Sequence, residues 1–311
     1  MREHVAPFVY YLEVHVLCAS LLCLATWALT SIKGGSATWK YWMWVVTSVN
    51  FVVPLAGFFN GFGSSHVSWA TQLGTLADVG IGISRSAGGG LAFLCVWLCG
   101  ALFMFTRLLV HLHRDRGESP AIVRSGPTRT WPLLADGVPV TFSTAAQCPS
   151  VGGLLRPHLS LPLGVDGLLT RNELDAVLMH EVTHARRRDN LIGLVHEIAL
   201  CGLWFHPLVW LTGSRLAMFR ELSCDDSVIA SSRGADLVTA LAKLADPGES
   251  RLLRVGAATL FRHRVARLKA SHPHRAQGAA DLALILIYAG VLVACALATI
   301  AHTPSCFNVA A

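Results

Sequence analysis

Charged residues are scarce in this sequence. Asp, Glu, Lys and Arg make up 14% of its 311 residues, whereas 53% are hydrophobic; a soluble globular domain contains about 25% charged residues. This shortage excludes a protein whose whole surface faces water and favours one built largely for lipid. The charges that are present lie mostly in the middle, because only four of the 25 Lys and Arg fall outside residues 107–275, namely Arg2, Lys33, Lys40 and Arg85.

Recognisable cysteine patterns are also missing. The sequence has nine Cys, but none of their spacings is that of a zinc knuckle or a disulfide framework. The basic central block likewise lacks a recognised nucleic-acid-binding motif, so we expect no direct nucleic acid binding. Lys and Arg concentrate on the cytoplasmic side of membrane proteins, and we therefore interpret the block as a sign of topology.

Four apolar runs approach or exceed the roughly 20 residues that a helix needs to cross a bilayer: residues 8–30, 42–62, 91–110 and 281–301. The third run ends in Arg and His residues that favour a cytoplasmic position. The sequence therefore predicts an α-helical multi-pass protein of the cytoplasmic membrane with four transmembrane helices. Residues 1–110 hold three of them, residues 111–280 form a cytosolic domain, and residues 281–311 form the fourth span and a short tail, with both termini outside. Interfacial aromatic residues would be Trp39, Trp42 and Trp44.

A His-Glu-x-x-His motif stands in the central block, at His180, Glu181 and His184. Thr170 and Glu173 form a capping box that starts a helix here, and residues four apart on a helix share one face. Two imidazoles so placed can bind one zinc ion, while Glu181 takes a proton from the water that the metal holds. The motif therefore predicts a zinc peptidase, provided that a third ligand can be found.

Glu221 is the candidate third ligand, on a separate helical pattern. Asp225 follows it at i+4, where it can accept the other ring N–H of a zinc-bound His. A helical acid is ordinarily a solvated surface charge, but the Glu-x-x-x-Asp spacing after the first motif favours a ligand. Peptide hydrolysis also needs a donor to the oxyanion, and no Tyr lies between Tyr41 and Tyr288. The alternatives for this donor are His206, Arg215 and Arg220.

Residues 190–211 are apolar enough to suggest a further span, but they contain Glu197. A Glu at the centre of a membrane helix costs about 2.5–3.5 kcal/mol, and a span here would place Glu221 across the membrane from the His pair. We therefore expect a helix, broken at Pro207, that packs against or dips into the inner face of the membrane. Its interfacial anchors would be Trp204, Phe205 and Trp210.

Three more patterns surround the motif. Short β-type runs separated by proline predict a small sheet within residues 118–166, in which residues 151–161 form either a structural hairpin or an edge strand that receives the substrate backbone. We expect Arg186, Arg187 and Arg188 to form a solvated or lipid-facing patch, with Asp189 pairing locally. Basic residues between Arg262 and Arg275, including Arg264, are expected to form a collar suited to anionic headgroups.

Four segments resemble the BlaR/MecR antirepressor family of membrane zinc peptidases: residues 151–157, 174–190, 204–210 and 220–226. The resemblance covers residues 117–230 and extends to the layout of spans around a cytosolic domain. It implies an α+β domain of the zincin-like (gluzincin) type. It also implies that Glu181 is the base, that Asp225 supports a ligand, and that zinc is bound by His180, His184 and Glu221.

The resemblance further implies signal transduction by cleavage of a cytosolic protein such as a transcriptional repressor, and often of the peptidase itself. The best-known members carry an extracellular penicillin-binding domain with a Ser-x-x-Lys motif after the fourth span. Because this sequence stops at Ala311, we expect neither that sensor domain nor direct β-lactam sensing. Membrane lipids are the other expected partners, and a homodimer is left open. Two alternatives remain: a housekeeping quality-control peptidase for membrane proteins, and a non-catalytic membrane signalling scaffold.

Overall fold

The computed structural model describes residues 2–32, 35–53, 87–117, 134–135, 137–144, 146, 148–244, 255–269 and 278–301. The helices are α1 (Arg2–Ser31), α2 (Ala37–Val52), α4 (Ala87–Gly117), α5 (Val165–Leu168), α6 (Arg171–Arg187), α7 (Asp189–Gly202), α8 (Pro207–Ala230), α9 (Gly234–Leu244), α10 (Val255–Lys269) and α11 (Gly278–Ala301). The strands are β1 (Leu134–Ala135), β2 (Val138–Ser143), β3 (Ser150–Gly152) and β4 (His158–Pro162). The described chain is thus mostly helical with one small mixed sheet.

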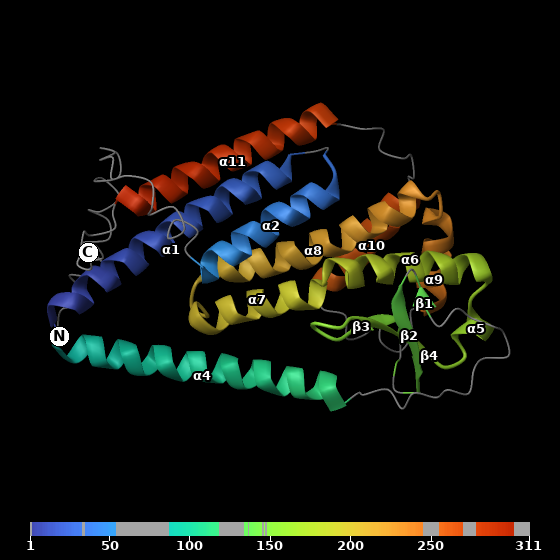
Figure 1. Ribbon diagram of the computed structural model, residues 1–311, viewed down its shortest axis with the longest axis horizontal. Helices are drawn as coiled ribbons and strands as arrows, with labels where there is room; N and C mark the ends of the chain where they lie inside the picture. Colours follow the sequence, from blue (N-terminus) through green and yellow to red (C-terminus); the bar gives the residue numbers. More distant parts are fainter. Residues whose placement is uncertain are drawn as a thin grey trace.

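Long apolar helices lie at one end of the molecule, and the sheet lies at the other with α6, α9 and α10 (Figure 1). The C-terminal ends of α1 and α4 and the N-terminal ends of α2 and α11 are nearest the sheet, so successive apolar helices run in opposite directions. Among the described residues, Cys95–His113 of α4 is long and apolar enough to cross a membrane, and shorter apolar stretches are His15–Ser31 and Asp281–Cys295. The four-span layout stays a prediction, and residues 54–62 of its second span lie outside the described residues.

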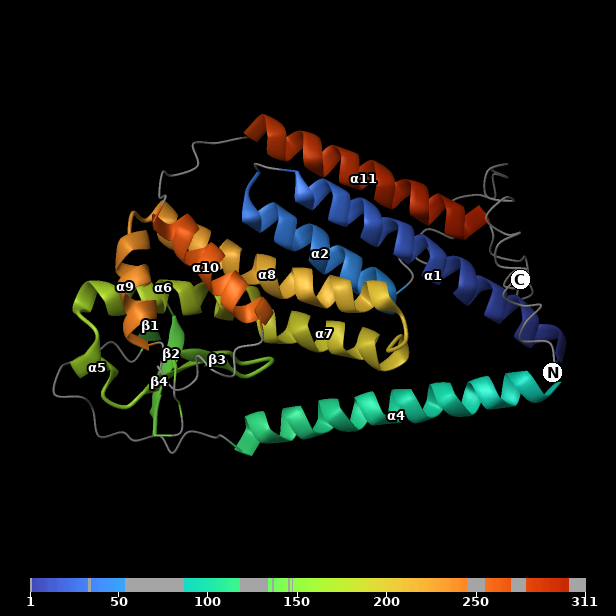
Figure 2. The same ribbon diagram turned by 180° about the vertical axis from the view of Figure 1, so that it is seen from behind.

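The expected helix with a break at Pro207 is confirmed, because α7 ends at Gly202 and α8 begins at Pro207. The two helices form a hairpin that runs alongside α2 (Figure 2), and its place at the inner face of the membrane stays a prediction. Its turn reaches Ser20 of α1, whose Oγ is 3.1 Å from Nε2 of His206. Glu197, whose charge argued against a span, pairs with Arg107 of α4 at 2.5 Å. Because α7 leads away from the His pair and α8 leads back, Glu221 returns to the same end of the molecule.

Two aromatic side chains expected at an interface pack against neighbouring helices. Trp44 is completely buried, and its Nε1 donates a hydrogen bond to Thr30 Oγ1 at 3.2 Å. Trp204 donates to the carbonyl of Trp97 at 3.3 Å, and a Cβ at Gly100 of α4 would lie 2.1 Å from the Trp204 ring. The interfacial prediction is wrong for Trp44, because neighbouring helices cover it completely. Trp204 is half-buried, and its interfacial position stays a prediction. Four others expected there remain partly exposed: Trp39, Trp42, Phe205 and Trp210.

The sheet has the strand order β1-β2-β4-β3. Its central pair, β2 and β4, is parallel, and the two outer pairs are antiparallel. Strand β3 is therefore an edge strand, with Val151 opposite Leu159 of β4. Leu159 is buried against Val182 and Ala185 of α6. The sheet thus positions the helix that carries the His pair.

Candidate metal centre

The helix that carries the His pair, α6, is delimited by its own sequence. Thr170 Oγ1 accepts a hydrogen bond from Glu173 N at 3.4 Å, and Glu173 Oε2 accepts one from Thr170 N at 2.8 Å. The predicted capping box is therefore confirmed. At the other end, Arg188 adopts a left-handed conformation with a φ of 55°, which is uncommon for a residue other than glycine and turns the chain into α7.

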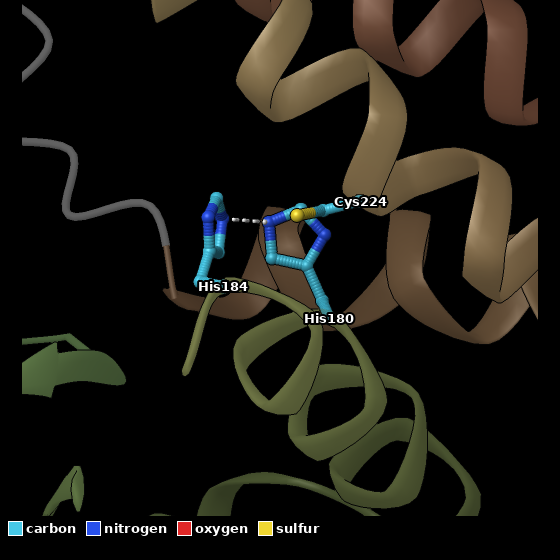
Figure 3. A group of neighbouring side chains, drawn as sticks. All are labelled: His180, His184 and Cys224. Atoms are coloured by element: carbon cyan, nitrogen blue, oxygen red, sulfur yellow. Dashed lines mark hydrogen bonds between the residues drawn. The ribbon is translucent and has the colours of Figure 1, made fainter. Parts of the chain in front are cut away.

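His180 and His184 face each other on α6, as Figure 3 shows. Their Nε2 atoms are 3.2 Å apart, and the ring centroids are 4.9 Å apart. Two ring nitrogens at that distance place their lone pairs against each other unless a proton or a metal ion lies between them. The space between the two Nε2 atoms is therefore suited to a cation.

A carboxylate lies behind each imidazole. His184 Nδ1 is hydrogen-bonded to Oδ2 of Asp189 at 2.6 Å. His180 Nδ1 lies 3.2 Å from Oδ1 of Asp225, an ion-pair distance without the alignment of a hydrogen bond. Zinc-bound His side chains almost always have such a partner, which fixes the tautomer and leaves Nε2 for the metal. Asp225 lies where the sequence placed it. Asp189 was missed in this role, although its position five residues after His184 was a signal that could have found it.

Glu221 completes the group from α8. Its Oε2 is 3.6 Å from His180 Nε2, and its Oε1 is 3.8 Å from His184 Nε2. The ligand atoms of a tetrahedral zinc ion, with bonds of about 2.0–2.1 Å, lie about 3.3 Å from one another. The three ligands predicted from the sequence are thus brought together, with donor atoms and spacing that fit zinc.

Cys224 is a second candidate for the third ligand, and sequence reasoning missed it. Its Sγ lies with ring nitrogens of both His in a group whose atoms are all within 4.8 Å of one another, and Figure 3 shows it approaching from α8. The side chain is completely buried, which raises the pKa of the thiol, and Arg187 Nη2 donates to Sγ at 2.9 Å. Among the described residues, Glu221 borders the cavity at the site and Cys224 does not. Glu221 is therefore the better placed of the two.

Arg264 of α10 enters the same group, which corrects its expected place in a lipid-facing collar. Its Nη1 lies 3.0 Å from Oε2 of Glu221, and its Nη2 lies 3.3 Å from Nε2 of His180. Three residues further along α10, Arg267 pairs with Asp226. Two neighbouring acids of α8, Asp225 and Asp226, thus pair with Arg264 and Arg267 of α10. No local motif in the sequence predicts these two pairs.

Arg187 is also placed differently from the expected solvated patch. It pairs with Asp189 at 2.7 Å and donates to Ser223 Oγ at 2.5 Å. Its guanidinium lies 4.4 Å from the ring centroid of Tyr41, a cation–π contact. The Arg187 side chain is partly buried because α2 covers the junction between α6 and α7. Arg186 and Arg188 are exposed, as expected, and the local pairing of Asp189 is confirmed.

The three alternatives for the oxyanion donor lie at different distances along α8. Arg220 borders the cavity, with its Nε 3.4 Å from Oε1 of Glu221. His206 precedes α8, about 22 Å from Glu221 at 1.5 Å per helical residue, and contacts Ser20. It is therefore wrong as a donor. Arg215 lies outside the described lining of the cavity, so Arg220 is the alternative that the geometry leaves.

Charged neighbours overcome the effect of burial at two of these groups. Burial alone would lower the pKa of His180, but Asp225 and Glu221 outweigh it and raise the pKa to about 9. Burial alone would raise the pKa of Glu221, but His180, His184 and Arg264 hold it well below its usual range. At Glu181 burial dominates and raises the pKa, which makes this carboxylate a stronger base than a solvated one.

A cavity of about 470 Å³ contains the site. Glu181 and the three predicted ligands border it, as do Ser150 and Val151 of the edge strand. Asn190 Nδ2 donates to the carbonyl of Val151 in that strand at 2.9 Å and to the carbonyl of Gly153, just after it, at 3.3 Å. Apolar side chains of α9 and α10 form another part of the wall: Leu237, Leu241, Leu244 and Phe261.

Comparison with known proteins connects this site to a family. Residues 90–236 match the family described as BlaR1 peptidase M56. The chain is 32% identical over 178 residues to the Regulatory protein BlaR1 of Bacillus licheniformis, a match that covers 53% of this chain and 28% of that protein. It is 19% identical over 175 residues to the Methicillin resistance mecR1 protein of Staphylococcus aureus, covering 53% of this chain and 30% of that protein. The chain thus spans less than a third of the length of these relatives.

Proposed function

We propose that this chain, whose residues 90–236 belong to the BlaR1 peptidase M56 family, is a zinc-dependent endopeptidase of the membrane. One observation carries the proposal: the Nε2 atoms of His180 and His184 and the carboxylate of Glu221 converge to separations of 3.2–3.8 Å. Carboxylates behind both imidazoles add support, because that is how zinc-bound His side chains are ordinarily held.

The chemistry can be assigned residue by residue. His180, His184 and Glu221 would hold the zinc ion, which would polarise the scissile carbonyl and lower the pKa of a bound water towards about 7. Glu181, which follows His180 on α6, would accept a proton from the attacking water and pass it to the leaving amine. Arg220 donates to the oxyanion. Asp225 and Asp189 keep the two imidazoles oriented.

We propose a cytosolic, repressor-like protein as the substrate, cleaved in response to a signal. The site lies at the end of the molecule where α4 finishes in Arg107, His111 and His113, and such basic clusters favour the cytoplasmic side. An extended segment would pair with β3, the edge strand at the cavity, where its backbone N–H would replace Asn190 at the carbonyl of Val151. The apolar wall formed by α9 and α10 suits an apolar side chain next to the scissile bond.

Glu181→Gln tests this function. Zinc content should be unchanged in the variant, while cleavage should fall by at least about 100-fold, the usual worth of a general base. The matched control is Glu197→Gln on α7, because Glu197 pairs with Arg107 rather than with the His pair. Wild type that binds no zinc, or a Glu181→Gln variant that cleaves as fast as wild type, would favour the scaffold alternative.

Comparison of the cytosolic and membrane proteins of cells that carry wild type or Glu181→Gln identifies the substrate. Accumulation of one transcriptional repressor supports the signalling function. Accumulation of many misassembled membrane proteins instead assigns the quality-control alternative, which uses the same metal centre.

A further inference from the structure

Tyr41 of α2 is connected to the metal centre through one side chain, Asp189. The phenol is completely buried, and its hydroxyl donates a hydrogen bond to Oδ1 of Asp189 at 2.6 Å. The other oxygen of that carboxylate, Oδ2, lies 2.6 Å from Nδ1 of His184. Two short hydrogen bonds therefore connect an apolar helix of the N-terminal bundle to an imidazole whose Nε2 faces His180.

Asp189 depends on these neighbours for its orientation. Only 3% of the residue is exposed, so bulk water cannot replace a lost partner. Oδ2 is shared between His184 and Arg187 Nη2, which lies 2.7 Å away, whereas Tyr41 is the partner found for Oδ1 among the described side chains. Without the hydroxyl, Oδ1 would be buried and unsatisfied, and the carboxylate would rotate to seek another donor.

The contact is one of several that dock α2 onto the peptidase helices. The backbone N–H of Ala37 donates to Asp226 Oδ2 at 3.2 Å, and Thr38 Oγ1 lies 3.1 Å from Ser223 Oγ. Figures 1 and 2 both show the start of α2 beside α8. Positions 37, 38 and 41 lie within little more than one helical turn, so this turn of α2 is held rigidly against the metal centre.

We propose that Tyr41 is a positioning residue for the metal: it fixes Asp189, and Asp189 fixes the His184 imidazole in the tautomer and direction that present Nε2. The inference rests on the proposed zinc-binding function. Tyr41 touches neither metal nor substrate. Loss of partners behind a metal-bound His typically weakens metal affinity by about 10–100-fold, so the Tyr41 hydroxyl should contribute an effect of roughly 10-fold.

Tyr41→Phe is the test, because it removes the hydroxyl and keeps the ring under Arg187. The matched control is Tyr288→Phe. Tyr288 of α11 is also buried, and its hydroxyl donates at 2.9 Å to the carbonyl of Met43, which lies on α2 like Tyr41. Among the described residues, the partners found for this hydroxyl are on α2 and none belongs to the metal centre. Zinc affinity of the full-length chain in detergent is measured by competition with a chelator, and thermal unfolding is followed in parallel.

Tyr41→Phe should bind zinc about 10-fold more weakly than wild type, while Tyr288→Phe binds like wild type. A second variant separates positioning from general destabilisation. Asp189→Asn already disrupts the support of His184, so Tyr41→Phe added to it should cause little further loss of affinity. Unchanged affinity in Tyr41→Phe, or a full additional loss in the double variant, overturns the inference. Wild type without measurable zinc overturns the proposed function itself, and the inference with it.

Discussion

Arg264 and Asp225 form a bidentate ion pair: Nε donates to Oδ2 and Nη2 donates to Oδ1, each at 2.8 Å. The carboxylate side chain is completely buried, and the guanidinium side chain is 12% exposed. Because Asp225 also faces His180, one base on α10 supports the group that orients a candidate metal ligand. The helix α10 is therefore part of the metal centre.

Arg264→Met is expected to destabilise the metal-free protein by about 3–5 kcal/mol, because the change leaves a buried carboxylate without its cation. Asp225→Asn in the same chain should recover part of that loss, since the unpaired charge is then gone. Unfolding of wild type, both single variants and the double variant, with a chelator present, gives the coupling between the two residues. Strictly additive losses would show that the pair is not coupled.

Glu221→Gln should weaken zinc binding by more than about 100-fold, because the loss of a ligand exceeds the loss of a group behind a ligand. Cys224→Ser should leave zinc affinity within about 3-fold of wild type. The Cys224 side chain is completely buried, and its Sγ accepts a hydrogen bond from Arg187. Chelator competition measures both. The reverse order of effects would assign the third ligand to the sulfur.

Arg220→Gln is expected to lower kcat by about 100–1,000-fold with little change in KM, because an oxyanion donor acts mainly in the transition state. Zinc content should not change. Arg215→Gln is the control, on the same helix and outside the described lining of the cavity. Equal kcat values for the two variants would mean that the donor is another residue.

Glu173 gives a pH dependence that can be tested away from the metal. Hydrogen bonds from Lys243 and from the backbone of Thr170 hold its pKa below the ordinary 4.5. A carboxyl whose pKa is lowered by folding stabilises the protein above its unfolded pKa and loses this contribution as pH falls through the folded value.

Glu173→Gln should therefore unfold at a lower temperature than wild type at pH 7, and the difference should shrink as pH falls below about 4. Thermal unfolding of both proteins across pH 3–7 in the presence of a chelator measures it. A difference that stays the same over this range would indicate lost packing at the helix start rather than a lost charge interaction.

The parts of the site that the sequence predicted depend on contacts within one helix. The capping box of α6, the His pair and the Glu221–Asp225 spacing all follow from i+3 and i+4 geometry. The structure brings these residues together, and it confirms the capping box. Asp189 could have been predicted as the partner of His184, which is only five residues before it. It was instead predicted to pair with the three neighbouring Arg residues.

The parts that were missed depend on helices distant in the sequence. Arg264 meets Asp225 across 39 positions, and Tyr41 meets Asp189 across 148; no local period encodes either meeting. The helix break at Pro207 was predicted, but the pairing of Glu197 with Arg107 of α4 was missed for the same reason. Trp44 was assigned to an interface because aromatic composition does not reveal which neighbours cover a helix.

The continuity of α8 has a practical consequence. One helix runs from its first turn, packed among apolar helices at Val209, to the acids at the metal centre. A fragment that begins after α4 would leave Val209, Leu216 and Phe219 facing solvent and would also lack Tyr41. The part of the chain that carries the candidate metal centre is therefore not a detachable module. Movement of the helices that pack around the first half of α8 would be transmitted to the metal centre through one continuous helix rather than through a flexible loop.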